Sequence, residues 1–182
     1  MTVTGLAFTT NANNAEPENY KIDNSHSSVH FRIKHLGVSY CYGRFNEIDG
    51  RLTMSGDDKN ALEITIKADS IDSNDKKRDD HLRGPDFFNV KQFPVISFKS
   101  SEFKKSGTDQ FKVTGDLTMH GVTKSVTVTL DHIGSGKDPW GGQRTGFEGT
   151  FEVKRSDFGI SYMPGGLGED VRIIVALEAI KQ

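Results

Sequence analysis

The chain has 182 residues, which is enough for one domain with a substantial core. Its 23 basic and 25 acidic side chains give a formal net charge of -2, so no excess of positive charge indicates binding to nucleic acid. The single cysteine, Cys41, excludes an internal disulfide, and no apolar run reaches the roughly 18 residues that a membrane-spanning helix needs.

The segment before the first strand pattern, residues 1–18, allows two interpretations. It has a short apolar run and no basic residue at its start, so it does not form an intact signal peptide. Its second half nevertheless resembles the end of one, with Ala15 at the point of cleavage. We therefore expect a flexible tail or a signal remnant over residues 1–18, and one folded domain over residues 19–182.

Apolar and polar residues alternate over most of the chain, as they do in antiparallel strands that face water on one side. Between Tyr40 and Met54 the apolar residues change from odd to even positions, which predicts a bulge or bend near residues 46–50. About ten such segments with one helical interruption indicate an all-β fold. Because so many antiparallel strands curl and closure removes the sheet edges, we expect an extended antiparallel β-barrel with room for one small ligand.

One short helical connection is predicted over residues 75–83. Ser73 or Asn74 is expected to cap its first turn, and Gly84 ends it with a proline behind. Leu82 is its only strongly apolar residue, so this helix is expected on a surface or over an opening rather than in the core.

Two adjacent aromatic residues, Phe87 and Phe88, follow this helix. An exposed pair of this size is costly, so both rings are expected to turn inward. We expect them to close or line one end of the barrel lumen, with the helix over the opening.

In each strand pattern, every second residue is expected to face inward, and we call this inward parity. These residues define the expected lumen wall. Most are large and apolar: Phe31, Ile33, Phe45, Leu52, Phe98, Leu117, Val128, Phe147 and Phe151. Three glycines, Gly43, Gly115 and Gly149, are mixed among them, and two interpretations stay open. They bend the strands at barrel corners, or they leave space for a tunnel, and an apolar tunnel suits an extended hydrocarbon better than a polar metabolite.

A few polar residues share this inward parity at strand ends: His35, Lys124, His132 and Arg155. Near a mouth they would meet an anionic or carbonyl head group, or they would extend into solvent at the rim. Both interpretations stay open.

The sequence contains no nucleophile elbow, phosphate-binding loop, zinc-protease motif or Cys-x-x-Cys motif. His26 and His30 are four residues apart along a strand, about 13 Å, which is too far for joint metal ligation. Cys41 lies among apolar residues and is interpreted as an inert core thiol. We therefore predict no catalytic residue, no metal and no cofactor.

The last strand pattern, residues 171–180, is apolar on both faces. Something must cover its second face, either the N-terminal segment or another subunit. The second of these favours a homodimer.

Several short motifs occur in a specific order and spacing. They are His26-Ser-Ser-Val-His-Phe31, Gly43-Arg-Phe45, Arg78-Asp-Asp-His81-Leu82, Asp86-Phe87-Phe88-Asn89, Gly115-Asp-Leu117-Thr118-Met-His-Gly121 and Arg155-Ser-Asp157-Phe158-Gly159. Together they resemble the YceI-like, polyisoprenoid-binding proteins. The resemblance implies a lipocalin-like barrel with an isoprenoid-like chain in its lumen, a periplasmic setting and, often, a dimer. It implies no catalytic residue.

The leading hypothesis is a carrier or store for a polyisoprenoid or similar long-chain amphiphile. Its expected ligand-binding residues are Phe31, Ile33, His35, Phe45, Leu52, Phe87, Phe88, Phe98, Leu117, Val128, Phe147, Phe151 and Arg155. The alternative is a protein-binding or inhibitory module whose barrel core is filled. An enzyme that acts on a lipid or quinone through His35, His132 or Arg155 ranks last, because no nucleophile is paired with a base. We expect a periplasmic or secreted location, with a cytoplasmic one as the alternative.

Overall fold

The computed structural model describes residues 16–56 and 59–182, and most of the expected tail or signal remnant lies outside them. Its strands form one antiparallel sheet. They are β1 (Glu18–Ile22), β2 (Ser28–His35), β3 (Ser39–Phe45), β4 (Ile48–Met54), β5 (Ala61–Lys67), β6 (Ile71–Asp72), β7 (Val95–Lys105), β8 (Gln110–Met119), β9 (Val122–Lys137), β10 (Gln143–Lys154) and β11 (Leu167–Lys181). The helical segments bounded within the described residues are α1 (Lys76–Leu82) and the 3-10 turns η2 (Ala68–Ser70) and η3 (Arg155–Phe158).

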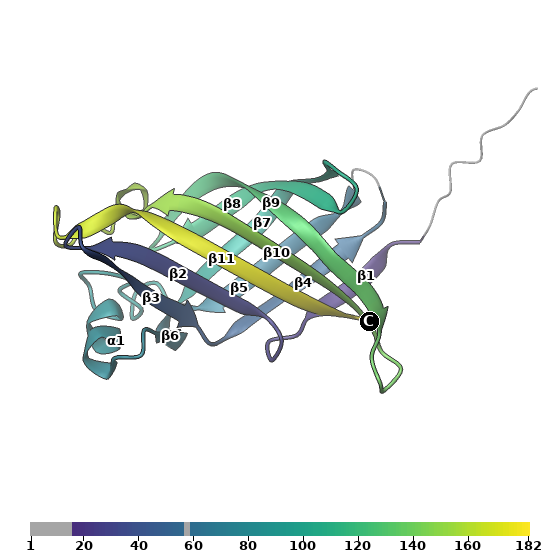
Figure 1. The fold of residues 1–182 in the computed structure, drawn as a ribbon, viewed down its shortest axis with the longest axis horizontal. Coiled ribbons are helices and arrows are strands. Elements are labelled where there is room, and N and C mark those ends of the chain that lie inside the picture. Colours follow the sequence, from purple (N-terminus) through teal and green to yellow (C-terminus); the bar gives the residue numbers. More distant parts are fainter. Residues whose placement is uncertain (1–15, 57–58) are drawn as a thin grey trace, which may run out of the picture.

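Eight of these strands close into a barrel, in the order β1, β4, β5, β7, β8, β9, β10 and β11, with β11 returning to β1. Strand β11 is long enough to pair twice on one side, with β2 over residues 167–176 and with β1 over residues 179–181. Strands β2, β3 and β6 therefore extend the wall beyond β1 at one end, as Figure 1 shows. The expected all-β, extended antiparallel barrel with one short helix is confirmed.

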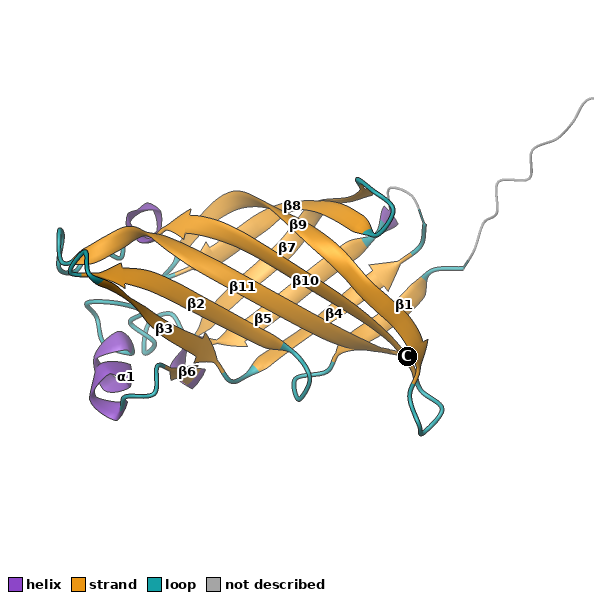
Figure 2. Cartoon of the chain, viewed as in Figure 1, coloured by secondary structure: helices purple, strands orange, loops and turns teal. Residues whose placement is uncertain are grey.

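The end of the barrel near α1 is completed by a helix and a loop instead of a strand. Strand β3 pairs with β6 through only two residues, Arg44 and Phe45. Beyond them lie α1 and the segment 84–94 (Figure 2). Arg83 ties this segment to the wall, since its guanidinium donates to the carbonyls of Asp69 and Ile71 at 2.8 Å each. We call this the α1 end, and the opposite end, where β11 finishes, the far end.

Helix α1 begins one residue later than expected, and its cap is neither Ser73 nor Asn74. The carboxylate of Asp75 accepts a hydrogen bond from the backbone N–H of Arg78 at 2.8 Å, so Asp75 is the cap. Asn74 has φ +62 and forms the turn before it, while Ser73 donates to the buried carboxylate of Asp79. Among the described residues, no helix is long and apolar enough to cross a membrane.

The expected break between β3 and β4 is confirmed, because pairing stops after Phe45 and resumes at Ile48. Two glycine-rich stretches, residues 134–142 and 158–169, have the composition of loops, but strands enter both of them. Strand β9 continues to Lys137 and pairs there with Gln143, and β11 already starts at Leu167. Their glycine-rich, polar residues resemble loops because these strand ends have no buried face.

The outer face of β11 is only partly covered. Ile174 lies between His30 and Thr150 of the neighbouring strands, and Ile174, Ala176 and Ile180 are half-buried. Strand β1 pairs beside the end of β11 and does not lie over this face. The homodimer therefore stays a prediction.

The far end is held by a cluster around Arg144. Its guanidinium donates to Asp23 at 2.8 Å, to Asp138 at 2.9 Å and also to Glu178, which joins the β1–β2 turn to β10 and β11. Ligand atoms of Asp23, His26 and Glu178 lie within 4.8 Å of one another, a spacing that suits a metal ion. The guanidinium already supplies the positive charge at this place.

Replacing Asp23 by Asn is expected to make the free energy of unfolding less dependent on pH in the acid range. Hydrogen bonds from Ser25, His26 and Arg144 hold the pKa of Asp23 well below its usual range. Because the folded pKa is depressed, the carboxylate stabilises the fold above the unfolded value of about 3.9, and this contribution is lost as the pH falls further. Urea unfolding at a series of pH values should show that the variant has a lower free energy of unfolding than the parent, and that this difference shrinks on acidification. A difference that stays constant with pH would contradict the depressed pKa of Asp23.

Candidate functional site

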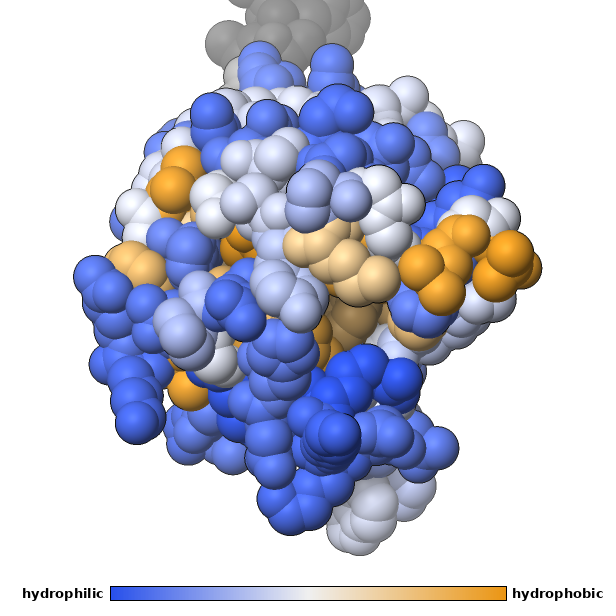
Figure 3. All heavy atoms as spheres, turned by 90° about the vertical axis from the view of Figure 1, so that its left-hand side faces the viewer, coloured by the Kyte–Doolittle hydropathy of each residue, from blue (hydrophilic) through white to orange (hydrophobic). Residues whose placement is uncertain are grey.

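A cavity of about 320 Å³ opens at the α1 end. Its wall comes from β2, β3, β11, α1, the segment 84–94 and the loop after η3. Figure 3 looks onto this end and shows apolar side chains in a central hollow, above the polar surface of α1. The volume lies in the range of small-molecule sites. We call it the near cavity.

A second cavity of about 110 Å³ lies deeper in the barrel, and every residue on its wall is apolar. We call it the deep cavity. Four residues line both cavities: Phe45, Met119, Val153 and Ile173. The two spaces therefore adjoin at these four side chains, and we call the two cavities together the apolar path.

The structure brings most of the sequence-predicted site residues to this path. Those on the near cavity are Phe31, Ile33, His35, Phe45, Phe87, Phe88 and Arg155, and those on the deep cavity are Phe45, Phe98, Leu117, Val128 and Phe151. Leu52 and Phe147 line neither cavity. Both are buried at the far end, where the rings of Phe103, Phe111 and Phe147 pack edge to face and fill the lumen.

Several wall residues were missed from the sequence. Met119 and Ile173 have the inward parity of their strands, so a signal for them existed. Tyr162 and Met163 also line the near cavity, but they lie in the glycine-rich stretch that carried no strand pattern. Only the folded chain places that stretch beside β2.

Two of the inward glycines each accommodate an aromatic ring of the adjacent strand. A Cβ at Gly43 would overlap the ring of Phe31 on the adjacent strand, and a Cβ at Gly115 would overlap the ring of Phe98. Each ring thus lies against the bare backbone of its neighbour. An aromatic ring covering a strand glycine in this way keeps the wall thin and the lumen wide.

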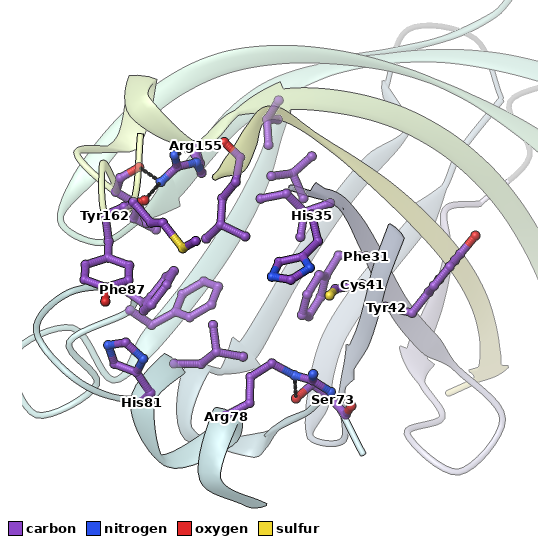
Figure 4. A pocket seen from close by; sticks show the side chains of 18 of the residues that line it. Phe31, His35, Cys41, Tyr42, Ser73, Arg78, His81, Phe87, Arg155 and Tyr162 are labelled. Carbon is purple, nitrogen blue, oxygen red and sulfur yellow. Dashed lines mark hydrogen bonds between the residues drawn. The ribbon is translucent and has the colours of Figure 1, made fainter. Parts of the chain in front are cut away.

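Arg155 does not meet solvent at the rim, contrary to one of the two expectations. It is 4% exposed, and its guanidinium donates to the carbonyls of Tyr162 at 2.7 Å, Gly168 at 2.9 Å and Ile160 at 3.2 Å. The carboxylate of Glu169 lies at 3.1 Å. Figure 4 shows this side chain reaching into the loop above the cavity. Its donors are engaged by the protein, so its role is to hold that loop.

Three rings meet across the mouth: His81 of α1, Phe87 of the following segment and Tyr162 of the loop after η3. Their centroids lie 5.0 to 5.2 Å apart, and His81 is joined to Asp86 at 2.9 Å. Behind Phe87, Phe88 packs edge to face on Phe45 at 5.5 Å. The mouth is therefore narrowed by side-chain contacts between the α1 region and the loop after η3, two segments that are not paired as strands.

The other inward polar residues separate in the fold. His35 lines the near cavity beside Cys41, and both point inward in Figure 4. His132 bonds to Ser135 and Thr145 at the far end, away from this mouth. Lys124 lies opposite Leu117, close to the β8–β9 turn, and its side chain is exposed, as the second interpretation expects. Parity was correct for His35, but it does not tell which end of a strand carries the opening.

Replacing both Phe87 and Phe88 by Ala is expected to speed the release of a bound hydrophobic probe several-fold. Truncating a buried Phe costs about 3–5 kcal/mol, and the half-buried Phe88 less, so stability falls whatever the role of the pair. The release rate of a polyene fatty acid from folded protein distinguishes rings that close the lumen from rings that only pack in the core. Phe103→Leu, in the packed far end, serves as control. Equal release from parent and double variant would show that these rings are ordinary core.

A model of the YceI-like domain family matches residues 20–179. The chain belongs to the YceI-like family. A UPF0312 protein of Pseudomonas aeruginosa (strain LESB58) is 45% identical over 177 residues, which cover 94% of this chain and 91% of the relative. Protein YceI of Salmonella arizonae is 42% identical, covering 100% of this chain and 96% of the relative.

Solved structures share the YceI-like barrel. Burkholderia cenocepacia BcnA matches with a TM-score of 0.79 at 25% identity, over 86% of this chain and 98% of that one. A polyisoprenoid-binding domain from Saccharophagus degradans matches with a TM-score of 0.68 over 90% of this chain and 98% of that one. Its identity is 13%, so this likeness concerns the fold alone. The family's barrel is a binding-type fold.

Proposed function

We propose that the chain binds a polyisoprenoid or a similar long-chain amphiphile in its lumen, as a carrier or store. The observation that carries this proposal is the pair of adjoining apolar cavities, whose path narrows at Phe45, Met119, Val153 and Ile173. A path of this shape suits an extended chain better than a compact, polar molecule. The domain from Saccharophagus degradans, a polyisoprenoid-binding domain with the same fold, supports the same ligand class.

The driving force is the burial of hydrocarbon. Each buried CH₂ contributes about 0.8 kcal/mol, so a ten-carbon stretch contributes on the order of 8 kcal/mol before the costs of association. The polar groups at the mouth, His35 and the ring of His81, would then face the head of the molecule. No metal or nucleotide is required for binding of this kind.

The alternative of a protein-binding module with a filled core fits only the far end. The enzyme hypothesis, which ranked last, gains no support from the contacts at the cavity. Among the described residues, no serine or cysteine on its wall hydrogen-bonds to a histidine.

We propose a periplasmic or secreted location, which cell fractionation tests.

Native mass spectrometry of the purified chain, followed by organic extraction, tests the proposal. We expect a mass adduct that is lost on denaturation and that is recovered as a long-chain amphiphile in the extract. A protein that carries no adduct, and that also fails to take up an added polyprenyl alcohol, would overturn it.

A further inference from the structure

Two neighbouring turns at the cavity mouth expose apolar side chains. Leu36 and Val38 lie on the β2–β3 turn, where Val38 is 83% exposed, and Tyr162 and Met163 lie on the loop after η3. The backbone N–H of Leu36 donates to the carbonyl of Gly166 at 2.7 Å, so the two turns are joined. We call the four exposed residues the mouth rim. Single exposed apolar residues are ordinary, but four on adjoining turns form a patch.

Two of these residues also have unfavourable backbone conformations. Leu36 has φ +49 and Met163 has φ +54, in the left-handed region that large side chains seldom adopt. Glycine, Asn or Asp would fit either turn with less strain, and a polar side chain would be better solvated. At both positions the chain instead has a large apolar residue, which is strained in this conformation and poorly solvated. Such departures concentrate at functional sites, which indicates that these side chains have a partner.

Charges on the β2–β3 hairpin, which carries two of the four rim residues, favour an anionic, amphipathic partner. Residues 34–40 include one lysine and no carboxylate, and residues 159–168 contain no charged side chain. Below the apolar tip, the outer face of the hairpin pairs Lys34 with Tyr40, and Arg32 with Tyr42. The guanidinium of Arg32 lies 4.3 Å from the ring of Tyr40.

From the tip downward, the apolar side chains come first, and below them tyrosine rings and cations lie side by side at the same levels. A protein surface that enters a bilayer interface has this arrangement, because apolar side chains enter the hydrocarbon while tyrosine rings and cations stay together at the level of the headgroups. A partner helix or a second copy would instead need a groove or a broad flat face.

We propose that the mouth rim docks onto an anionic phospholipid bilayer and that the barrel takes up its ligand there. The inference rests on the proposed function, because a docked mouth matters only if a lipid enters it. Tyr162 and Met163 line the near cavity as well as the rim, so the apolar surface continues from the docking face into the lumen. Figure 3 shows apolar side chains at one edge of this end and in the hollow beside it. An extracted chain would cross no polar barrier on this route.

Vesicle co-sedimentation tests the docking. The probes are phosphatidylcholine vesicles, and vesicles in which about one lipid in three is phosphatidylglycerol. We expect the parent to bind the anionic vesicles more tightly, and more weakly as salt rises. Leu36→Asn with Val38→Ser should reduce partitioning by roughly tenfold or more, since two apolar anchors are lost. Asn is well tolerated at a left-handed position, so the variant should fold.

The matched control is Ile133→Ser with Trp140→Ser, which removes two exposed apolar side chains at the far end. Its partitioning should equal that of the parent. A parent that binds neither vesicle, a rim variant that binds like the parent, or a control that loses as much as the rim variant would each overturn the proposal. Sedimentation velocity that shows a parent dimer and a monomeric rim variant, without vesicle binding, would instead assign the surface to a second copy.

Native mass spectrometry of the same samples separates this inference from the proposed function. Bound lipid with no vesicle association would overturn the docking and leave the proposed function standing. Vesicle association without any bound or extractable lipid would overturn the proposed function, and with it the uptake at the rim.

Discussion

Replacing Arg155 by Ala is expected to lower the free energy of unfolding by about 3–5 kcal/mol, the range typical of breaking a buried, hydrogen-bonded charge network. The guanidinium donates to the backbone carbonyls of Ile160, Tyr162 and Gly168, and it is paired with Glu169. Without it, these carbonyls lose their donors, that of Ile160 in a buried hydrogen bond and those of Tyr162 and Gly168 in partly buried ones. An unsatisfied buried group costs about 1–3 kcal/mol, so several of them account for the expected loss.

Urea unfolding measures this loss, and Arg172→Ala is the matched control. Arg172 is also an arginine paired with a glutamate, but its contact with Glu152 at 3.1 Å is exposed on the barrel surface. Exposed pairs contribute about 0–1 kcal/mol, so the control should remain close to the parent. Arg155→Lys should recover only part of the stability, because one ammonium group does not reach carbonyls spread around a planar guanidinium. A loss at Arg155 no larger than that at Arg172 would contradict the assigned role.

The loop that Arg155 holds carries Tyr162 onto the mouth. The alanine variant, where it is still folded, should therefore also release a bound probe faster than the parent. Hydrogen exchange of the backbone amides between residues 160 and 168 should rise, while that of β7 and β8 should not. This pattern distinguishes a loose loop from general destabilisation.

Alternation in the sequence predicted the strands and their inner faces, because a strand with one buried side must place apolar residues at every second position. It predicted Phe31 and Phe98 on the wall for this reason. Parity carries no information on depth along the barrel axis. Leu52 and Phe147 have the same pattern, yet they lie where other rings fill the lumen.

The parts that sequence reasoning missed depend on contacts between distant segments. Asp75 rather than Ser73 caps α1 because the Asp79 carboxylate takes the serine's hydrogen bonds, a choice that composition cannot decide. The loop after η3 has neither periodicity nor charge, and it becomes a wall through the hydrogen bonds that Arg155 and Leu36 donate to its carbonyls. Local patterns therefore define the barrel, whereas the mouth is defined by side chains that meet after closure.

Replacing Ile173 by Trp is expected to divide the path through the barrel and to abolish tight binding of long chains. Ile173 lies on the walls of both cavities, so an indole ring there projects into the passage between them. Each five-carbon unit excluded from the deep cavity loses about 4 kcal/mol of burial, nearly a thousandfold in Kd. A short chain that fits the near cavity alone should bind almost as before. Overpacking costs about 1–3 kcal/mol in a filled core, and less where the ring enters existing space.

Titration with a short-chain and a long-chain alcohol of the same head group measures the effect. The control is Ile174→Trp, the next residue of β11, whose side chain is half-buried on the outer face between His30 and Thr150. It places the same ring on the same strand without touching the lumen, so both affinities should equal those of the parent. Equal weakening of the short and the long chain by Ile173→Trp would mean that ligands do not extend past this residue. The deep cavity would then be a packing defect of the core.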